Sequence, residues 1–227
     1  MLQKSPIRFG GVLCLAFSSA LIAQASANTS NTTPWPPHDV EFGTGAYAVQ
    51  DSVLATGTTN QLVSTGLSSP LTPPSLSGSL ASSTLTNVTT GLISASTVIS
   101  SHDSVSDSAA ATIALTMGTT PNTDAILISA ATSETRAHCH DVYPRLPMST
   151  SVGTVSVNGN PVVVTGAPNQ IVPLPNSAGQ LILNQQIEDD FGEHQGRAVA
   201  NAVNASAPGQ DVIVAHTQGF ADCWDQR

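Results

Sequence analysis

Only three cysteines occur in the 227 residues of this chain, and their positions constrain its fold. Cys14 lies in an apolar run, residues 12–23, which follows two basic residues and stops just before Ala25-Ser26-Ala27. A basic start, a short apolar core and a small-x-small site are the three parts of a secretory signal. Residues 1–27 are therefore predicted to be a signal peptide, which takes Cys14 with it when it is removed.

The two remaining cysteines, Cys139 and Cys223, are expected to form one inter-strand disulfide. Exported proteins meet an oxidising environment, in which paired cysteines are oxidised. Closing so long a span of chain stabilises the fold by roughly 4 to 5 kcal/mol on the chain-entropy estimate. The alternative is a pair of free buried thiols.

The charge of the chain disfavours anionic partners. After the signal, four arginines stand against fifteen acidic residues. Such a negative surface disfavours nucleic acid and anionic lipid headgroups. No second apolar stretch approaches the ~20 residues of a membrane span, so we expect no transmembrane span in the mature chain.

Alternating apolar and polar residues between turn-forming clusters predict an all-β fold. Residues 28–40 are rich in proline, lack any period and are predicted to be a disordered leader. Residues 41–227 are predicted to be a single β-rich extracellular domain, an antiparallel sandwich or barrel-like structure. Strands are expected at residues 45–55, 80–88, 91–99, 108–117, 125–137, 170–174, 181–187 and 212–217, with a linker at 66–78. Residues 197–207 fit a strand or a helical turn, and strand is favoured.

The clearest local signal lies at residues 152–165. Two valine-rich runs there flank Asn158-Gly159. Asn-Gly is the preferred pair of a type I′ turn, in which both residues take positive φ. A tight hairpin is therefore predicted, with Pro161 where no ladder donor is needed.

Several short motifs, taken in order, resemble the choice-of-anchor P family of exported bacterial proteins. They are Gly43-Thr44-Gly45-Ala46-Tyr47, Val157-Asn158-Gly159, Ala167-Pro168-Asn169, Leu181-Ile182-Leu183-Asn184-Gln185-Gln186 and Asp211-Val212-Ile213-Val214-Ala215. The resemblance implies an extracellular β-rich domain of unassigned activity that an interchangeable C-terminal anchor tethers to the cell envelope. The chain departs from the family in two ways: no anchor follows Cys223, and Gln185-Gln186 replaces an acidic residue.

The strongest chemical cluster is His138-Cys139-His140-Asp141. On a strand, the two histidines would point to one face and Cys139 to the other. They would offer two ligands to a metal, whereas a catalytic zinc needs three. A third ligand could come from the fold alone, and the candidates for it are His102, His194 and His216.

Other catalytic signals are weak. Residues 188–193 (Glu-Asp-Asp-Phe-Gly-Glu) are acidic but lack the alternating ligand spacing of a calcium loop. The sequence contains no nucleophile elbow and no phosphate-binding glycine motif. No catalytic, cofactor-binding or metal-binding residue is assigned on this basis.

The sequence favours a secreted or envelope-exposed structural or interaction module without catalytic activity. Its partner would be a cell-envelope component or an extracellular protein or polysaccharide, and its location extracellular or periplasmic. The alternative is a metal-binding exported protein or a metal-dependent hydrolase that uses His138 and His140. Exposed sheet edges could also pair with a second copy of the chain.

Overall fold

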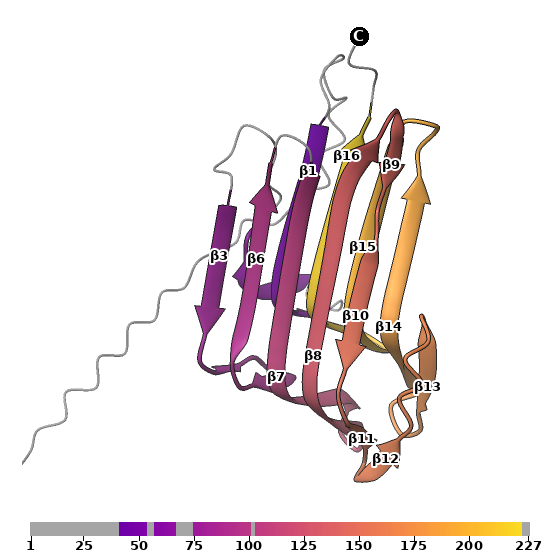
Figure 1. Ribbon diagram of the computed structural model, residues 1–227. Helices are drawn as coiled ribbons and strands as arrows, with labels where there is room; N and C mark the ends of the chain where they lie inside the picture. The colour runs from indigo at the N-terminus through magenta and orange to yellow at the C-terminus, as the bar shows by residue number, and fades with distance from the viewer. Residues whose placement is uncertain (1–40, 54–56, 67–74, 101–102, 224–227) are drawn as a thin grey trace, which may run out of the picture.

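The computed structural model describes residues 41–53, 57–66, 75–100 and 103–223, so the predicted signal peptide and leader lie outside the described residues. These ranges form strands and turns, arranged in two antiparallel sheets that pack face to face (Figure 1). The sheets are not closed into a barrel, and the predicted all-β class is thus confirmed in its sandwich form. No helix in the described ranges is long and apolar enough to cross a membrane.

The first sheet has six strands. In spatial order they are β13 (Gln170–Leu174), β14 (Gly179–Asp190), β15 (Gln195–Ala207), β16 (Gln210–Asp222), β1 (Glu41–Val53) and β2 (Thr58–Ser64). β15 pairs with β14 and β16 over almost its whole length. Residues 197–207, which fitted either a strand or a helical turn, therefore belong to a central strand.

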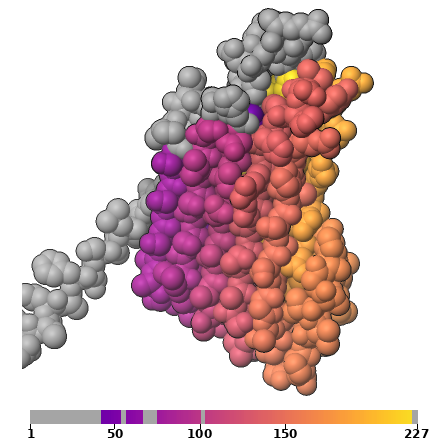
Figure 2. Space-filling model, in the orientation of Figure 1, coloured from indigo at the N-terminus to yellow at the C-terminus, as the bar shows by residue number. Residues whose placement is uncertain are grey.

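The second sheet has ten strands and forms the broad front layer in Figures 1 and 2. They are β3 (Ser75–Leu80), β4 (Ser83–Thr84), β5 (Val88–Thr90), β6 (Ile93–Ile99), β7 (Asp103–Thr119), β8 (Asn122–His140), β9 (Tyr143–Arg145), β10 (Met148–Val152), β11 (Val155–Val157) and β12 (Asn160–Val162). β7 and β8 form a long central hairpin. β6 and then β3 continue the sheet beside β7, and β9, β10 and β11 pair with successive parts of β8.

The predicted strands agree best with the structure where turn-forming residues such as Asn, Gly and Pro lie at the strand ends. β13 occupies residues 170–174 as predicted. The hairpin of β11 and β12 turns at Asn158 (φ 51°) and Gly159 (φ 79°), as a type I′ turn requires. Two predictions differ from the structure. Of the linker expected at 66–78, residues 75–78 belong to β3, and residues 67–74 lie outside the described residues. Residues 80–88, expected to form one strand, hold the last residue of β3, then β4, and the first residue of β5.

Near the middle of several long strands, the alternation of inward and outward side chains shifts by one residue. In β16, Val212 and Val214 are buried in the core on one side of Ala215. On its other side the inward positions are Thr217 and Ala221. Ala215 has a positive φ of 51°, and one such residue inserted into a strand turns the following side chains to the opposite face.

An interruption of the same kind occurs in both sheets, and in the six-stranded sheet it lies at one level of neighbouring strands. Asn184 in β14 (φ 54°) and Thr112 in β7 (φ 50°) are left out of the strand register, as Ala215 is. Ala48 and Ala202, which lie at this level in β1 and β15, have no register partner either. The sandwich is thus divided into two halves along its strands.

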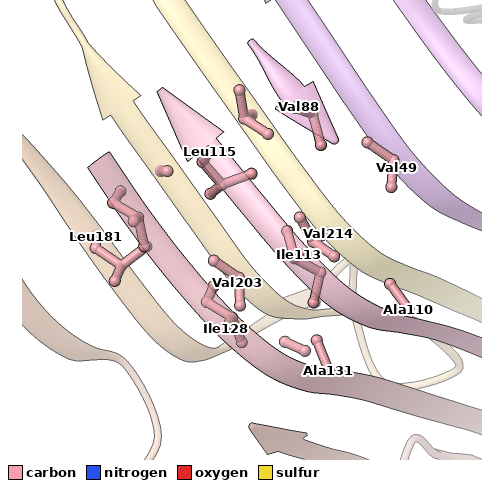
Figure 3. Close-up of a cluster of buried hydrophobic side chains, with 14 of the residues drawn as sticks. Val49, Val88, Ala110, Ile113, Leu115, Ile128, Ala131, Leu181, Val203 and Val214 are labelled. Atoms are coloured by element: carbon pink, nitrogen blue, oxygen red, sulfur yellow. The ribbon is translucent and has the colours of Figure 1, made fainter. Parts of the chain in front are cut away.

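One half holds the large aliphatic core (Figure 3). Its largest fully buried side chains come from both sheets and include Ile113, Leu115, Ile126, Leu181 and Leu183. Burying one such side chain contributes about 1.5–3 kcal/mol. The chain is poor in aromatic residues, with 4% in all, and branched aliphatic side chains fill this half instead.

The other half is built from small residues, which bring the two sheets close together. Hydroxyl groups cross the gap: Ser106 Oγ donates to Gln218 O (3.0 Å), and Thr135 Oγ1 lies 2.8 Å from Thr217 Oγ1. A Cβ atom added at Gly219 would lie 3.0 Å from Thr135 Cγ2. The hydrogen bonds satisfy hydroxyl groups that would otherwise be costly to bury.

Candidate binding face on the ten-stranded sheet

The disulfide predicted from the sequence is present. The sulfur atoms of Cys139 and Cys223 are 2.08 Å apart and the two Cα atoms 5.6 Å apart. Cys139 belongs to β8, and Cys223 directly follows β16, so that the bond links the two sheets. The sulfurs pack in a small apolar cluster at the end of the small-residue half. That cluster contains Phe42, Ala137, Leu146, Ala198 and Ala221.

The histidines beside Cys139 lie near the exposed end of β8. His140 Nδ1 is 3.3 Å from Asp141 Oδ2, and both side chains are more than two-thirds exposed. His138 is half-buried, and the disulfide occupies the sulfur of Cys139. Two ligand candidates are therefore present at this point of the fold.

The other histidines considered as a third ligand have different surroundings. His194 Nδ1 lies 2.9 Å from the carbonyl oxygen of Val142, and the buried His216 contacts Asn201. His102 lies outside the described residues. Within the described ranges, no group of three His, Cys, Asp or Glu side chains could hold a metal ion.

The acidic segment ends β14 and continues into the turn before β15. Glu188, Asp189 and Asp190 belong to the strand, and the rest of the segment lies in the turn. Asp190 Oδ1 accepts a hydrogen bond from the Gly192 amide, and Arg197 Nε lies 3.9 Å from Asp189 Oδ2. These contacts are local ones on an exposed surface.

A different surface, which sequence reasoning did not find, gathers more polar groups. Five residues on adjacent strands follow one another across the outer face of the ten-stranded sheet. They are Ser77 on β3, Ser96 on β6, Asp107 on β7, Glu134 on β8 and Ser149 on β10, each in register with the next. We call this row and its neighbours Ser79, Ser94, Ala109 and Thr132 the serine face.

The serine face arises from a period of two in the sequence. Serines at residues 75, 77 and 79 of β3, and at 94 and 96 of β6, alternate with residues on the inner side. The face forms the front surface in Figure 2, from violet β3 to salmon β10. A shallow hollow of about 720 Å³ lies over it and is lined by residues of the serine face.

Two carboxylates meet at the centre of this hollow. Asp107 and Glu134 are directly opposite in the β7–β8 register. Burial, followed by the charge of Glu134, raises the pKa of Asp107, although Arg136 and a hydrogen bond from Ser96 oppose the shift. Arg136 Nε forms an ion pair with Glu134 Oε1. Like charges placed opposite each other in a sheet are destabilising, and this pair is therefore a cost to the fold.

The chemistry of the hollow suits hydrogen bonding. Serine and threonine hydroxyls both donate and accept, and each ionised carboxylate offers two acceptor oxygens with about four lone-pair sites. The side chains that line the hollow carry hydroxyl, carboxylate and methyl groups. A ligand with many hydroxyl groups would find complementary partners there.

A second polar network lies on the outer face of the six-stranded sheet. The rings of Tyr47 and His216 stack with centroids 4.1 Å apart, and His216 Nδ1 lies 2.6 Å from Asn201 Oδ1. Gln185 Oε1 accepts from Asn201 Nδ2 and Asn204 Nδ2. Burial, and secondarily Arg197, lowers the pKa of His216 to about 3, so the ring is neutral. Burial, with the charge of Asp211, raises the pKa of Tyr47.

Comparisons of the chain with protein-family models, curated protein sequences and solved structures gave no match. The resemblance to the choice-of-anchor P family therefore stays a prediction from the motifs of the sequence.

Proposed function

We propose that this chain is an exported binding module without catalytic activity, and that it holds a polyhydroxylated ligand, such as an envelope or extracellular polysaccharide, on the serine face. The observation that carries the proposal is the row of five in-register polar residues that crosses five strands under one hollow. Asp107 lies opposite Glu134 within this row, and Arg136 offsets the repulsion of the two carboxylates only in part. Opposed carboxylates are favourable when a ligand donates hydrogen bonds to both.

Export supports the same proposal. The N-terminal segment has the three parts of a secretory signal, and the disulfide is of the kind that persists in oxidising compartments. The resemblance to an exported family points in this direction too. The location that we propose is extracellular or periplasmic.

The test is binding of the purified mature chain to a panel of cell-envelope and other extracellular polysaccharides, by pull-down and calorimetry. Asp107→Ala and Glu134→Ala are each expected to weaken binding by about 10- to 150-fold, because hydrogen bonds to charged groups contribute about 1.5–3 kcal/mol. The matched control is Glu188→Ala, which removes an exposed carboxylate from β14 and leaves the serine face intact. Circular dichroism confirms that each variant folds.

Two results would contradict the proposal. One is the absence of binding to any polysaccharide of the panel, or binding that Asp107→Ala and Glu134→Ala leave unchanged. The other is stoichiometric zinc or calcium in native mass spectra of protein purified without added metal, together with hydrolase activity that His138→Ala abolishes.

A further inference from the structure

The edge strand β3 lies at one side of the serine face. β3 pairs with β6, and among the described residues no strand pairs with its other side. Such an edge exposes a row of backbone N–H and C=O groups that can accept another strand. β3 forms the left border of the front sheet in Figure 1.

Other edges of the sandwich carry features that discourage pairing. Pro173 in β13, Pro161 in β12 and Pro144 in β9 each remove a backbone donor. β2 is interrupted by a positive φ of 50° at Val63. β3 has six residues in unbroken register with β6, and it contains neither proline nor a charged side chain.

The sequence of β3 is suited to pairing with itself. It reads Ser-Leu-Ser-Gly-Ser-Leu, with the serines on the outer face. If two copies pair antiparallel with Ser77 opposite Ser77, then Ser75 lies opposite Ser79 and Leu76 opposite Gly78. Residues opposite one another in a sheet share a face, so serine meets serine outside and leucine meets glycine inside.

Charge also favours contact at this edge. The chain has a formal net charge of −9, which opposes association through most of its surface. Asp107, the nearest carboxylate of the serine face, is two strands away from the edge. Five strand spacings would separate the two copies of Asp107, about 24 Å, which exceeds the Debye length of about 8 Å at physiological salt.

We propose that a second copy of this chain pairs antiparallel with β3, about a two-fold axis through Ser77, and joins two ten-stranded sheets into one. The paired edges bring two serine faces into one continuous surface. A polymeric ligand that contacts both hollows would then bind more tightly than through one, because the second contact is intramolecular. The pairing itself depends on β3 alone and is independent of what the serine face binds.

Site-directed cross-linking tests the pairing and its register. The Ser77→Cys chain, oxidised under mild conditions, is expected to form disulfide-linked dimers, because opposite Cα atoms in an antiparallel pair lie about 4.5–5.5 Å apart. Neither Ser75→Cys nor Ser79→Cys cross-links well alone, but an equal mixture of the two yields mixed dimers. The control is Ser94→Cys, on the same face but on the interior strand β6.

Sedimentation equilibrium supplies a second readout without new thiols. The unaltered chain is expected to dimerise, and Ser77→Lys to raise its dissociation constant on the order of fivefold, since it places like charges opposite each other. Ser94→Lys, which adds the same charge on β6, leaves the dimer intact. A monomer at every soluble concentration, or equal cross-linking of Ser77→Cys and Ser94→Cys, would overturn the proposal. Neither result would bear on polysaccharide binding by a single copy.

Discussion

Asp124 is a buried carboxylate held by donors from two separate loops. Its oxygens accept hydrogen bonds from Asn158 Nδ2 (2.6 Å), from the Ser177 amide and Oγ (both 2.7 Å) and from the Asn176 amide (3.1 Å). Burial opposes ionisation, but hydrogen bonds from Ser177, Asn158 and Asn176 outweigh it and lower the pKa of Asp124. The carboxylate therefore ties the β11–β12 hairpin and the turn before β14 to β8.

Asp124→Asn is expected to lower the free energy of unfolding by about 2–3 kcal/mol at pH 7, because the amide nitrogen cannot accept from the donors around it. Asp107→Asn is the matched change on the serine face. It relieves the repulsion from Glu134 and is expected to shift stability by less than about 0.5 kcal/mol. Urea unfolding of both variants is the measurement. Equal losses from both would show that the donors around Asp124 have no special role.

His216 makes stability depend on pH. Its folded pKa of about 3 lies below the unfolded value near 6.5, and the unfolded chain therefore binds the extra proton between these two pH values. The stability that depends on the neutral ring is fully present above pH 6.5 and is lost as the pH falls toward 3. Between pH 7 and pH 5 the free energy of unfolding is expected to fall by about 1–2 kcal/mol.

The comparison of two histidine variants isolates this effect. His216→Gln is expected to flatten the profile of unfolding free energy between pH 7 and pH 5. His140→Gln, at an exposed ring, is expected to keep the slope of the unaltered chain. If all three chains gave the same slope, the acid sensitivity would come from another group.

Within a single element, the mid-strand interruption of β7 is expected to reduce stability at Thr112. Thr112 is exposed and has a positive φ of 50°, which is costly for a β-branched residue. Thr112→Gly is expected to raise the free energy of unfolding by about 0.5–1 kcal/mol, since glycine adopts this conformation freely. Thr116→Gly, at an exposed position four residues along the same strand, is expected to lower it by about as much. Thermal unfolding of the pair measures the difference, and a loss of stability in both would contradict it.

The same interruption explains where the sequence pattern succeeds and fails. Strict alternation along residues 45–55 would place Ala46 and Val49 on opposite faces of one strand. Both side chains are buried toward the core, because the parity changes at Ala48 between them. The residues at positive φ in these interruptions are Val63, Thr112, Asn184 and Ala215. None of them is glycine, and only Asn184 is of a type that is enriched at positive φ. The turn at Asn158-Gly159 was predicted correctly because asparagine and glycine readily adopt the positive φ that a type I′ turn requires.

At the scale of the molecule, the sequence placed the disulfide but missed the serine face. The cysteines could be paired because only two remained after the signal. The row from Ser77 to Ser149 requires the register of five strands, and that register depends on long-range pairing. The period-two serines of β3 and β6 were a visible signal. However, the part of β3 before residue 79 fell in a segment assigned to a linker on account of its prolines.

The disulfide is expected to contribute to the free energy of unfolding of the whole molecule. Cys139 and Cys223 are 84 residues apart in sequence, and their bond ties β8 to the end of β16. Replacing both by alanine is expected to lower the free energy of unfolding by about 4–5 kcal/mol, because the unfolded chain regains the entropy of an open loop. Urea unfolding of the oxidised chain, the reduced chain and the double variant measures this loss.

The reduced chain and the double variant should unfold at similar urea concentrations, both below that of the oxidised chain, and reductant should leave the double variant unchanged. Because the bond links the two sheets at the small-residue end, its loss should first appear as faster amide exchange near Phe42, Ala137 and Ala221. The aliphatic core around Ile113 and Leu183, at the other end of the strands, should keep its protection until global unfolding. Uniform loss of protection across both halves would instead show that the sandwich unfolds as one unit.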